Sequence, residues 1–407
     1  MNTPKIRFKG FKDDWEQRKF SELYAKSSEK NDGSIGMDKN ITVATMQFKE
    51  DVKVSTAEYL KTYYTFNFGD IAFEGHQSKE FRYGRFVEND IGNGIVSHIF
   101  AVFRPIREYD LHFWKYAINN EALMQRILSR STKASTMMHD LVTNDFLNET
   151  FLVPSLDEQR RIGAFLDTLD NLITLHQRKC DETKQLKKFM LQKMFPKNGE
   201  KNPEIRFEGF TDDWEQRKLG EMVSLRGRIG FRGYTQNDLV GEGDGAITFS
   251  PADIDNDGNV SLEGNKYLTW EKYEESPEIK VQIGDILFTK TASIGKVGYV
   301  RELKEKATIN PQFALLTPNE KANGYFTFLS VRNNVFMKQV RSITGGSSVP
   351  TMSQEKLKEL TFMTPSLEEQ KKIGEYFEKL DYLITLHQRK CEKLKELKKY
   401  MLQNMFV

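Results

Sequence analysis

The sequence is poor in cysteine and contains no long apolar run. Two cysteines among 407 residues cannot build a disulfide framework, so we expect a reducing, cytoplasmic location. No apolar run approaches the roughly 18 residues that a membrane helix needs. The first ten residues have no apolar core and do not predict a signal peptide. We therefore expect neither a membrane protein nor a secreted one.

The chain also lacks a strong excess of charge of either sign. It has 60 Lys and Arg against 58 Asp and Glu, which gives a formal net charge of +2. Bulk charge therefore does not predict nucleic-acid binding, and any basic surface must be local. With 38% hydrophobic and 29% charged residues, the chain has the composition of an ordinary globular protein. Its length suits two to four domains.

Familiar catalytic motifs are missing as well. There is no Walker A motif, and "GRIGFRG" (227–233) spaces its glycines like a turn-rich loop rather than a dinucleotide fingerprint. "NPQF" (310–313) lacks the second proline of the Asn-Pro-Pro-Tyr/Phe motif of adenine-N6 methyltransferases. "DIDNDGNVSLEG" (253–264) begins like a calcium loop but has Gly264 where the bidentate glutamate belongs, which favours an acidic turn. We expect no catalytic residue, metal or cofactor in this chain.

What the chain does contain is a duplication. The 20 residues from Pro4 recur from Pro203 with 14 identities, and the 42 residues from Pro154 recur from Pro365 with 27 identities. Repeats of this kind indicate the architecture of the chain, so we interpret them before any local pattern. Each half of the chain thus places a short repeat and a long repeat around a segment of its own.

The two enclosed segments share a plan but few residues. "FNFGDIAFEG" (66–75) and "VQIGDILFTK" (281–290) both place Gly-Asp before an apolar run, which predicts a tight turn entering a strand. The patterns predict further strands at 94–105 and 307–318 and one short helix in each segment at 111–130 and 324–342. Each segment is therefore predicted to form a mixed, β-rich domain.

The long repeats are predicted to be helices. Each begins with Pro-Ser-Leu, an acid and Glu-Gln, which suits a helix start, and neither contains an internal proline. A helix of about 38 residues is roughly 57 Å long and needs a partner in water. We expect the two to pair antiparallel as a coiled coil. The predicted seam comprises Ile162, Leu166, Leu169, Ile173, His176 and Cys180, and in the second repeat Ile373, Phe377, Leu380, Ile384, His387 and Cys391.

Both cysteines lie four residues after a histidine in these repeats. His176 with Cys180 and His387 with Cys391 share a helix face. If the helices cross here, four ligands could converge on zinc, and a disulfide is a weaker alternative. Packing in the seam is the favoured interpretation, since a free cysteine behaves as a small apolar residue.

These patterns together predict an α+β fold made of two duplicated halves. Two β-rich domains cover residues 1–153 and 203–364. Two long helices cover residues 154–196 and 365–407, and a polar linker covers 197–202. A pseudo-two-fold axis would relate the halves.

Basic and polar loops in both domains are candidates for DNA binding. Lys and Arg anchor phosphates, whereas Arg, Gln, Asn and Lys also read base edges in the major groove. For any single residue, a solvated loop is the alternative. The candidates are His76, Gln77, Lys79, Arg82, Arg85, Arg130 and Lys133 in the first domain, and Arg226, Arg228, Arg232, Gln236, Lys290, Thr291, Ser293, Lys296, Ser347 and Ser348 in the second.

The ordered set of Gly-Asp-Ile-Ala/Leu-Phe strands and Pro-Ser-Leu-x-Glu-Gln helices resembles the specificity subunits of type I restriction–modification systems. The resemblance covers nearly the whole chain. It implies two target-recognition domains, each reading half of a split double-stranded DNA sequence, with the helices acting as a ruler between them. It also implies that the chain itself is not catalytic.

The resemblance further implies partner subunits. Two modification subunits would bind S-adenosylmethionine and methylate adenine N6, and restriction subunits would join for ATP-dependent translocation and cleavage. S-adenosylmethionine, ATP and Mg²⁺ are thus expected in the partners. Three alternatives stay open: a stand-alone DNA-binding regulator, an enzyme with an unrecognised site, and a scaffold that never touches DNA.

Overall fold

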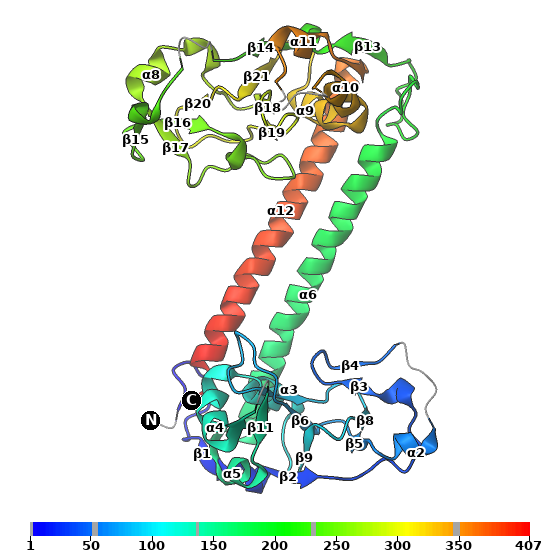
Figure 1. Ribbon diagram of the computed structural model, residues 1–407, viewed down its shortest axis with the longest axis vertical. Helices are drawn as coiled ribbons and strands as arrows, with labels where there is room; N and C mark the ends of the chain where they lie inside the picture. The colour runs from blue at the N-terminus through cyan, green and yellow to red at the C-terminus, as the bar shows by residue number, and fades with distance from the viewer. Residues whose placement is uncertain (1–2, 51–55, 136–137, 229–232, 345–350) are drawn as a thin grey trace. The chain divides into compact units, whose positions relative to one another are not determined.

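The chain folds into two compact units, of which the first is discontinuous in sequence. Unit 1 is Met1–Arg178 with His387–Val407, and unit 2 is Lys179–Leu386. The computed structural model describes residues 3–50, 56–135, 138–228, 233–344 and 351–407. Two long helices, α6 (Leu156–Lys193) and α12 (Leu367–Asn404), each contribute residues to both units (Figure 1). Each unit therefore combines one variable segment with part of each long helix.

Unit 1 is built around a four-stranded antiparallel sheet in the order β2-β9-β6-β7. Its strands are β2 (Tyr24–Ser27), β9 (Ala101–Pro105), β6 (Ile71–Glu74) and β7 (Arg85–Glu88). Two-stranded ribbons pair β1 (Glu16–Lys19) with β12 (Thr150–Val153), β3 (Ile41–Thr42) with β4 (Gln47–Phe48), β5 (Tyr64–Phe66) with β8 (Gly94–Val96), and β10 (Thr132–Ala134) with β11 (His139–Leu141). Its short helices are α1 (Phe20–Leu23), α2 (Ala57–Leu60), α3 (Leu111–Ile118), α4 (Glu121–Ser131) and α5 (Thr143–Asn148).

Unit 2 repeats this sheet in the order β14-β21-β18-β19. Its strands are β14 (Val223–Arg226), β21 (Phe313–Pro318), β18 (Ile286–Thr289) and β19 (Val297–Tyr299). A second sheet contains β15 (Leu239–Val240), β17 (Lys266–Thr269), β16 (Gly245–Phe249) and β20 (Ala307–Ile309), and a ribbon pairs β13 (Glu215–Lys218) with β22 (Thr361–Thr364). Its short helices are α7 (Leu219–Met222), α8 (Trp270–Glu274), α9 (Gly324–Arg332), α10 (Asn334–Thr344) and α11 (Gln354–Glu359). The α+β class with duplicated halves is thereby confirmed.

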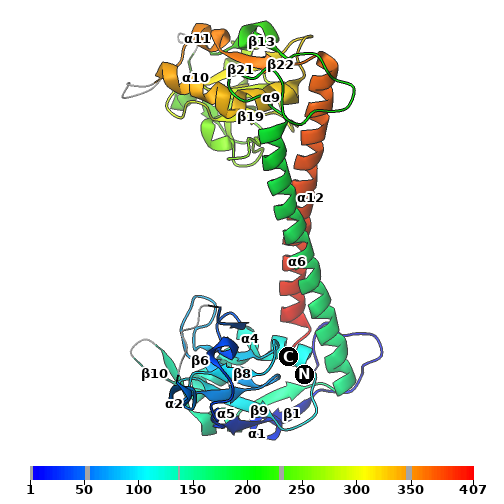
Figure 2. The ribbon, with the colours of Figure 1, turned by 90° about the vertical axis from the view of Figure 1, so that its right-hand side faces the viewer.

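The two long helices lie side by side and antiparallel within each unit (Figure 2). In unit 1, Cys391 of α12 lies beside the Ile173 carbonyl of α6, and Lys398 contacts Asp170 nearer the start of α6. In unit 2, the Cys180 thiol lies 3.9 Å from the Ile384 carbonyl oxygen. The residue numbers rise on one helix as they fall on the other, which confirms the predicted antiparallel pairing.

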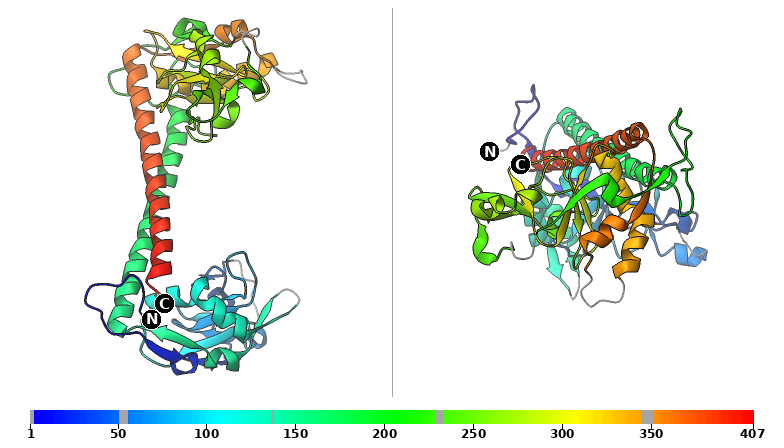
Figure 3. Two further views of the ribbon diagram at one scale, coloured as in Figure 1. Left: turned by 90° about the vertical axis from the view of Figure 1, so that its left-hand side faces the viewer. Right: turned by 90° about the horizontal axis from the view of Figure 1, so that it is seen from above.

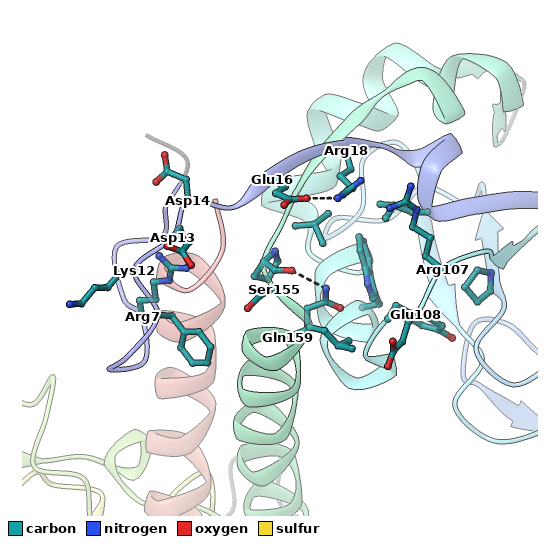
Figure 4. A pocket seen from close by; sticks show the side chains of 18 of the residues that line it. Arg7, Lys12, Asp13, Asp14, Glu16, Arg18, Arg107, Glu108, Ser155 and Gln159 are labelled. Atoms are coloured by element: carbon teal, nitrogen blue, oxygen red, sulfur yellow. Dashed lines mark hydrogen bonds and ion pairs between the residues drawn. The ribbon is translucent and has the colours of Figure 1, made fainter.

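The start of α6, which is repeated at α12, holds the helix to the rest of unit 1. The Arg7 guanidinium donates to both oxygens of Glu158 at 2.6 and 2.8 Å, and this carboxylate is almost completely buried. The side chain of the next residue, Gln159, accepts from the Asp110 amide at the start of α3 and donates to the Pro154 carbonyl (Figure 4). The Glu-Gln pair of the repeat thus joins three segments of the chain.

Unit 2 reproduces this junction. Arg206 donates to both oxygens of Glu369 at 2.7 and 2.8 Å, and Gln370 accepts from the Asn323 amide before α9. The helix glycines beside these junctions allow close approach. A Cβ on Gly163 would lie 2.7 Å from Asp110 Oδ1, and one on Gly374 would lie 2.4 Å from Asn323 Oδ1.

The C-terminal end of each long helix completes a domain core. In unit 1, Phe406 stacks on Phe113 with ring centroids 5.4 Å apart, and the Ile6 amide donates to the Asn404 carbonyl at 2.9 Å. Figure 3 shows the C-terminus of the chain in unit 1, at the end of α12. In unit 2, Phe195 stacks on Phe326 at 5.6 Å. The predicted seam residues Ile162, Leu166 and Leu169, and likewise Ile373, Phe377 and Leu380, are buried in these domain cores rather than in a seam of two helices alone.

The central His and Cys positions fill the helix pair. Within unit 1, His176 Nδ1 lies 3.0 Å from His387 Nδ1, and Cys391 packs against the backbone of Ile173. Both cysteines are buried and form no disulfide. Within the described ranges, no three His, Cys, Asp or Glu side chains group closely enough to hold a metal ion. The geometry therefore gives the zinc and disulfide alternatives no support.

One predicted element was wrong in each domain. The single helix expected at 111–130 is two helices, α3 and α4, because Asn120 leaves the helical conformation and its side chain caps Ala122 N. The helix expected at 324–342 likewise divides into α9 and α10 at Asn333, whose backbone is extended. Among the described residues, no helix has both the length and the apolar character needed to cross a membrane.

Candidate nucleic-acid interface

The Gly-Asp turn of unit 1 positions the strand that leads to the first group of candidates. Gly69 has a φ of 87°, which favours glycine, and Asp70 directly precedes β6. The buried Asp70 carboxylate accepts from the Asn67 amide at 2.9 Å and from Arg104 at 3.1 Å. Burial raises the pKa of Asp70, although Arg104 opposes that shift. The turn is thus held by polar contacts inside the domain and is a structural feature.

Unit 2 builds the same turn with a different partner. Gly284 has a φ of 93°, and the Asp285 carboxylate accepts from the Gln282 amide at 2.7 Å. Its other oxygen accepts from the Thr317 hydroxyl at 2.6 Å instead of from an arginine. Each turn leads into a buried strand, β6 or β18. That strand ends at a loop that contains candidate DNA-binding residues.

In unit 1, two predicted candidate segments lie side by side. The loop 75–84 connects β6 to β7, and the hairpin of β10 and β11 lies against it. His76 forms a β-bridge with Met138, and the His139 amide donates to the Gly75 carbonyl at 2.8 Å. We call these two segments the unit 1 loop pair.

Unit 2 brings the equivalent segments together. The loop 290–296 connects β18 to β19, and residues 351–353 lie against it. Thr291 forms a β-bridge with Thr351, and the Met352 amide donates to the Lys290 carbonyl at 2.8 Å. We call these segments the unit 2 loop pair. Because β6 and β18 hold the same place in their sheets, the two loop pairs hold the same place in their units.

Most unit 1 candidates lie on the surface of the loop pair. His76, Gln77, Lys79, Arg82 and Lys133 are exposed. The remaining two are engaged in ion pairs within the domain. Arg85 donates to Glu74 at 2.8 Å, and Arg130 donates to Glu149 at 2.8 Å.

The unit 2 candidates are more deeply set. Lys290 and Thr291 are half-buried, and partial burial lowers the pKa of the Lys290 ammonium. Lys296 donates to the Pro251 carbonyl and Arg226 to the Thr317 hydroxyl. The exposed candidates of this unit are Gln236 and Ser293.

Arg228 does not belong to the candidate surface. It is only 5% exposed, and its guanidinium donates to the Ile309 carbonyl at 3.2 Å and to the Thr308 hydroxyl at 3.3 Å. Burial lowers its pKa. Its charge is therefore used inside the domain. Three further candidates, Arg232, Ser347 and Ser348, lie outside the described residues.

One residue of this surface was missed in the sequence. A Cβ on Gly227 would lie 2.6 Å from Gln354 Nε2 and 3.3 Å from Lys290 Nζ, so both polar groups lie next to this glycine. Gln354 is half-buried at the start of α11, directly after the N-cap Ser353. The cap signal locates a helix start, but only the pairing of Thr291 with Thr351 shows that it lies beside Lys290.

A cavity of about 390 Å³ lies in unit 1 at the start of α6 (Figure 4). Its lining carries both signs of charge and includes Arg7, Arg107, Asp13 and Glu108. This mixture gives no preference for an anion or a cation. The cavity therefore adds no candidate chemistry to the loop pairs.

The acidic segment 253–264 is a turn in this structure. The Asp255 carboxylate accepts from the backbone amides of Asp257 and Asn259, each at 2.8 Å. Asp253 accepts from the Ser250 hydroxyl at 2.8 Å. These carboxylates are used by the turn itself, which agrees with the favoured interpretation of the sequence.

Known proteins are similar to this chain in sequence and in fold. The chain is 24% identical over 292 residues to the type I restriction enzyme MjaVIII specificity subunit of Methanocaldococcus jannaschii, covering 70% of this chain and 67% of that protein. It is 22% identical to the putative MjaX specificity subunit of the same organism, covering 98% of this chain and 94% of that protein. The crystal structure of a type I restriction–modification S subunit from M. genitalium matches 100% of this chain and 99% of its own, with 14% identity and a TM-score of 0.59.

The family match follows the duplication. The model of the type I restriction modification DNA specificity domain matches residues 12–185 and again 211–396. Each match covers one variable segment and most of the long helix that follows it. Two copies of one domain, each carrying a loop pair, thus account for most of the chain. The chain belongs to the type I restriction–modification DNA specificity family.

Proposed function

We propose that this chain is the non-catalytic specificity subunit of a type I restriction–modification complex and that each loop pair reads one half of a bipartite DNA target. One observation carries the proposal. The two loop pairs hold equivalent places beside equivalent strands, yet their side chains differ almost completely. Because the loop pairs hold equivalent positions, both can bind the same kind of ligand, DNA. Because their side chains differ, each can read a different base sequence.

The side chains of the loop pairs have the chemistry for base reading. In unit 2, Lys290 and Gln354 lie together, and such groups donate to guanine O6 or N7 and pair with adenine N6 and N7. In unit 1, Gln77 and Lys79 are exposed on the loop 75–84. The glycine beside Lys290 lets the backbone come close to a ligand.

Exposed apolar residues on the long helices support docking of two modification subunits. Leu186 and Phe189 of α6 are 44% and 48% exposed, and their repeat counterparts Leu397 and Tyr400 of α12 are 37% and 53% exposed. Residues three apart share a helix face. Unit 2 thus carries one such pair and unit 1 the other, so each unit offers the same surface to one copy of the same partner.

The remaining roles follow from this arrangement. The modification subunits would supply S-adenosylmethionine and the transfer of its methyl group to adenine N6, and restriction subunits with ATP and Mg²⁺ would join through them. The long helices would set the length of the unread spacer between the half-sites. One heptad inserted in α6 should lengthen that spacer and leave both half-sites unchanged.

The test combines co-purification with sequencing. The chain should purify with its modification subunit in a ratio of one to two, and single-molecule sequencing of methylated DNA should give a bipartite motif. Lys290→Ala should relax one half-site at a single base pair, with about 1–3 kcal/mol of lost discrimination. Lys304→Ala, an exposed lysine of the same unit, is the matched control.

Two results would contradict the proposal. Tight and specific DNA binding without any methyltransferase would favour a stand-alone regulator. Full methylation with an unchanged motif in a variant lacking Lys290, Gln354, Gln77 and Lys79 would show that the loop pairs do not read DNA.

A further inference from the structure

An aspartate of α6 connects three elements of unit 1. The Tyr116 hydroxyl of α3 lies 2.6 Å from Asp170 Oδ2, and Lys398 Nζ of α12 lies 2.6 and 2.8 Å from the two Asp170 oxygens. Lys398 also lies over the Tyr116 ring, 4.9 Å from its centroid. One carboxylate thus ties the recognition domain to both long helices.

Unit 2 has the same connection with the roles of the helices exchanged. Asp381 of α12 accepts from the Tyr325 hydroxyl of α9 and from Lys187 Nζ of α6. Arg301 of the recognition domain adds a third contact to Asp381 at 2.9 Å. Asp381 and Lys398 are the repeat counterparts of Asp170 and Lys187, 211 positions later in each case.

The two tyrosines, however, are not counterparts. Helix α3 is capped by Asp110 and α9 by Asn323, so Tyr116 is the sixth residue after its cap and Tyr325 the second after its cap. The place of Tyr325 is taken in unit 1 by His112, which pairs with Asp167. Two dissimilar domains therefore reach the same aspartate of the repeat from different helical turns. The two tyrosines contact equivalent aspartates although they stand at different positions in the domains. This points to a role of the aspartate and its lysine partner, and not to similarity inherited by the domains.

We propose that Asp170 and Asp381 are positioning residues that fix the orientation of each recognition domain on the long helices and thereby the spacer length that the protein accepts. The inference rests on the proposed function. Apolar packing is non-directional, whereas charge-assisted hydrogen bonds specify geometry. A recognition domain without this link can tilt on the helices, and its half-site can then be read at neighbouring spacings.

The two links should differ in strength. The Asp381 and Lys187 side chains are 15% and 12% exposed, whereas those of Asp170 and Lys398 are 36% and 25% exposed. Screening by water is weaker for the more buried pair. Loss of Asp381 should therefore broaden the accepted spacing more than loss of Asp170.

The test uses the full chain in complex with its modification subunit and a DNA library in which the half-sites are fixed and the spacer varies. Asp170→Asn and Asp381→Asn should raise methylation at spacers one base pair longer or shorter, relative to the cognate spacer, by roughly threefold or more. Both half-sites should stay unchanged. Asp157→Asn, at an exposed acid of α6, is the matched control and should leave the profile as it is.

A milder variant guards against loss of folding. Tyr116→Phe removes one hydroxyl and should broaden the profile in the same direction. The Tyr116 hydroxyl also lies 2.9 Å from Asp167 Oδ1. The double variant with Asp170→Asn should therefore broaden the profile by less than the sum of the two single changes, because both remove the contact between Tyr116 and Asp170. An unchanged spacer profile in variants that still methylate the cognate site would overturn the positioning role alone. A wild-type complex without a bipartite motif would instead overturn the proposed function.

Discussion

The two units hold the aspartate of the Gly-Asp turn with different polar groups. At the Gly-Asp turn, Asp70 is held by Arg104 in unit 1, whereas Asp285 is held by Thr317 in unit 2. Both residues hold the same place on the strand next to β6 or β18. The backbone is thus the same in both units. The buried carboxylate accepts a hydrogen bond from whichever side chain stands at that strand position.

A second difference lies on the neighbouring strand. Glu88 of β7 pairs with Ile71, and Tyr299 of β19 pairs with the equivalent Ile286. Glu88 is buried, and neither of its oxygens has a hydrogen-bond partner among the described residues. Burial raises the pKa of this carboxyl well above its ordinary value. Unit 1 therefore carries a polar cost that unit 2 avoids with an aromatic ring.

The largest effect should come from the junction that the units share. Arg7→Ala leaves the buried Glu158 carboxylate without its ion pair, which should cost about 3–5 kcal/mol of unfolding free energy. Arg206→Ala should cost about the same for Glu369, since the bond lengths agree within 0.1 Å. Chemical denaturation checks this, with Lys12→Ala as the exposed control. A loss below about 1 kcal/mol in either variant would contradict the role of the junction.

Exchanging the donors of the Gly-Asp turns should have the next largest effect. Arg104→Thr replaces the charged donor to Asp70 by threonine, the residue at the equivalent position 317 of unit 2. The change should lower the free energy of unfolding by about 1.5–3 kcal/mol. The residues around Thr317 in unit 2 fit a threonine, whereas those around position 104 in unit 1 fit an arginine. Thermal unfolding measures the loss, and an unchanged Tm would show that the two turns are interchangeable.

The helix glycines should respond more weakly. Gly163→Ala and Gly374→Ala place a methyl group within 2.7 Å of the caps of α3 and α9. The strain should cost about 1–3 kcal/mol, offset in part by the better helix propensity of alanine. Thr168→Ala on the exposed face of α6 is the control. Stabilisation of both variants would show that the caps can move aside.

The smallest effect concerns the buried glutamate and depends on pH. With its folded-state pKa raised, Glu88 keeps a proton above about pH 4.3 that the unfolded chain releases, so unit 1 loses stability as pH rises. Glu88→Gln should remove this loss and gain about 1 kcal/mol near neutral pH, with no gain below pH 4. Thermal unfolding from pH 4 to 8 tests this against the exposed Glu80→Gln. A gain that does not vary with pH would contradict the assignment.

The repeats and their local signals made most of the fold predictable. Pro-Ser-Leu at Pro154 and Pro365 marks helix starts, and Gly69-Asp70 marks a turn, because capping and a positive φ depend on adjacent residues. The break at Asn120 was not predicted, since an asparagine inside an amphipathic pattern is compatible with either outcome.

The candidate interface was less predictable because it depends on contacts that are distant in sequence. Arg228 looks like a surface arginine in a glycine-rich loop, but it binds the Ile309 carbonyl, 81 residues away. Gln354 becomes a candidate only through the pairing of Thr291 with Thr351. No local pattern contains either fact.

The division of the chain also dictates an order of folding during synthesis. Unit 2 is one continuous stretch, whereas unit 1 needs His387–Val407, which is synthesised only after the whole of unit 2. Until then Trp15 and Phe113 lack their contacts with Phe406. Most of unit 1 is therefore synthesised before unit 2 but completed after it, and its apolar core stays incomplete while unit 2 is made.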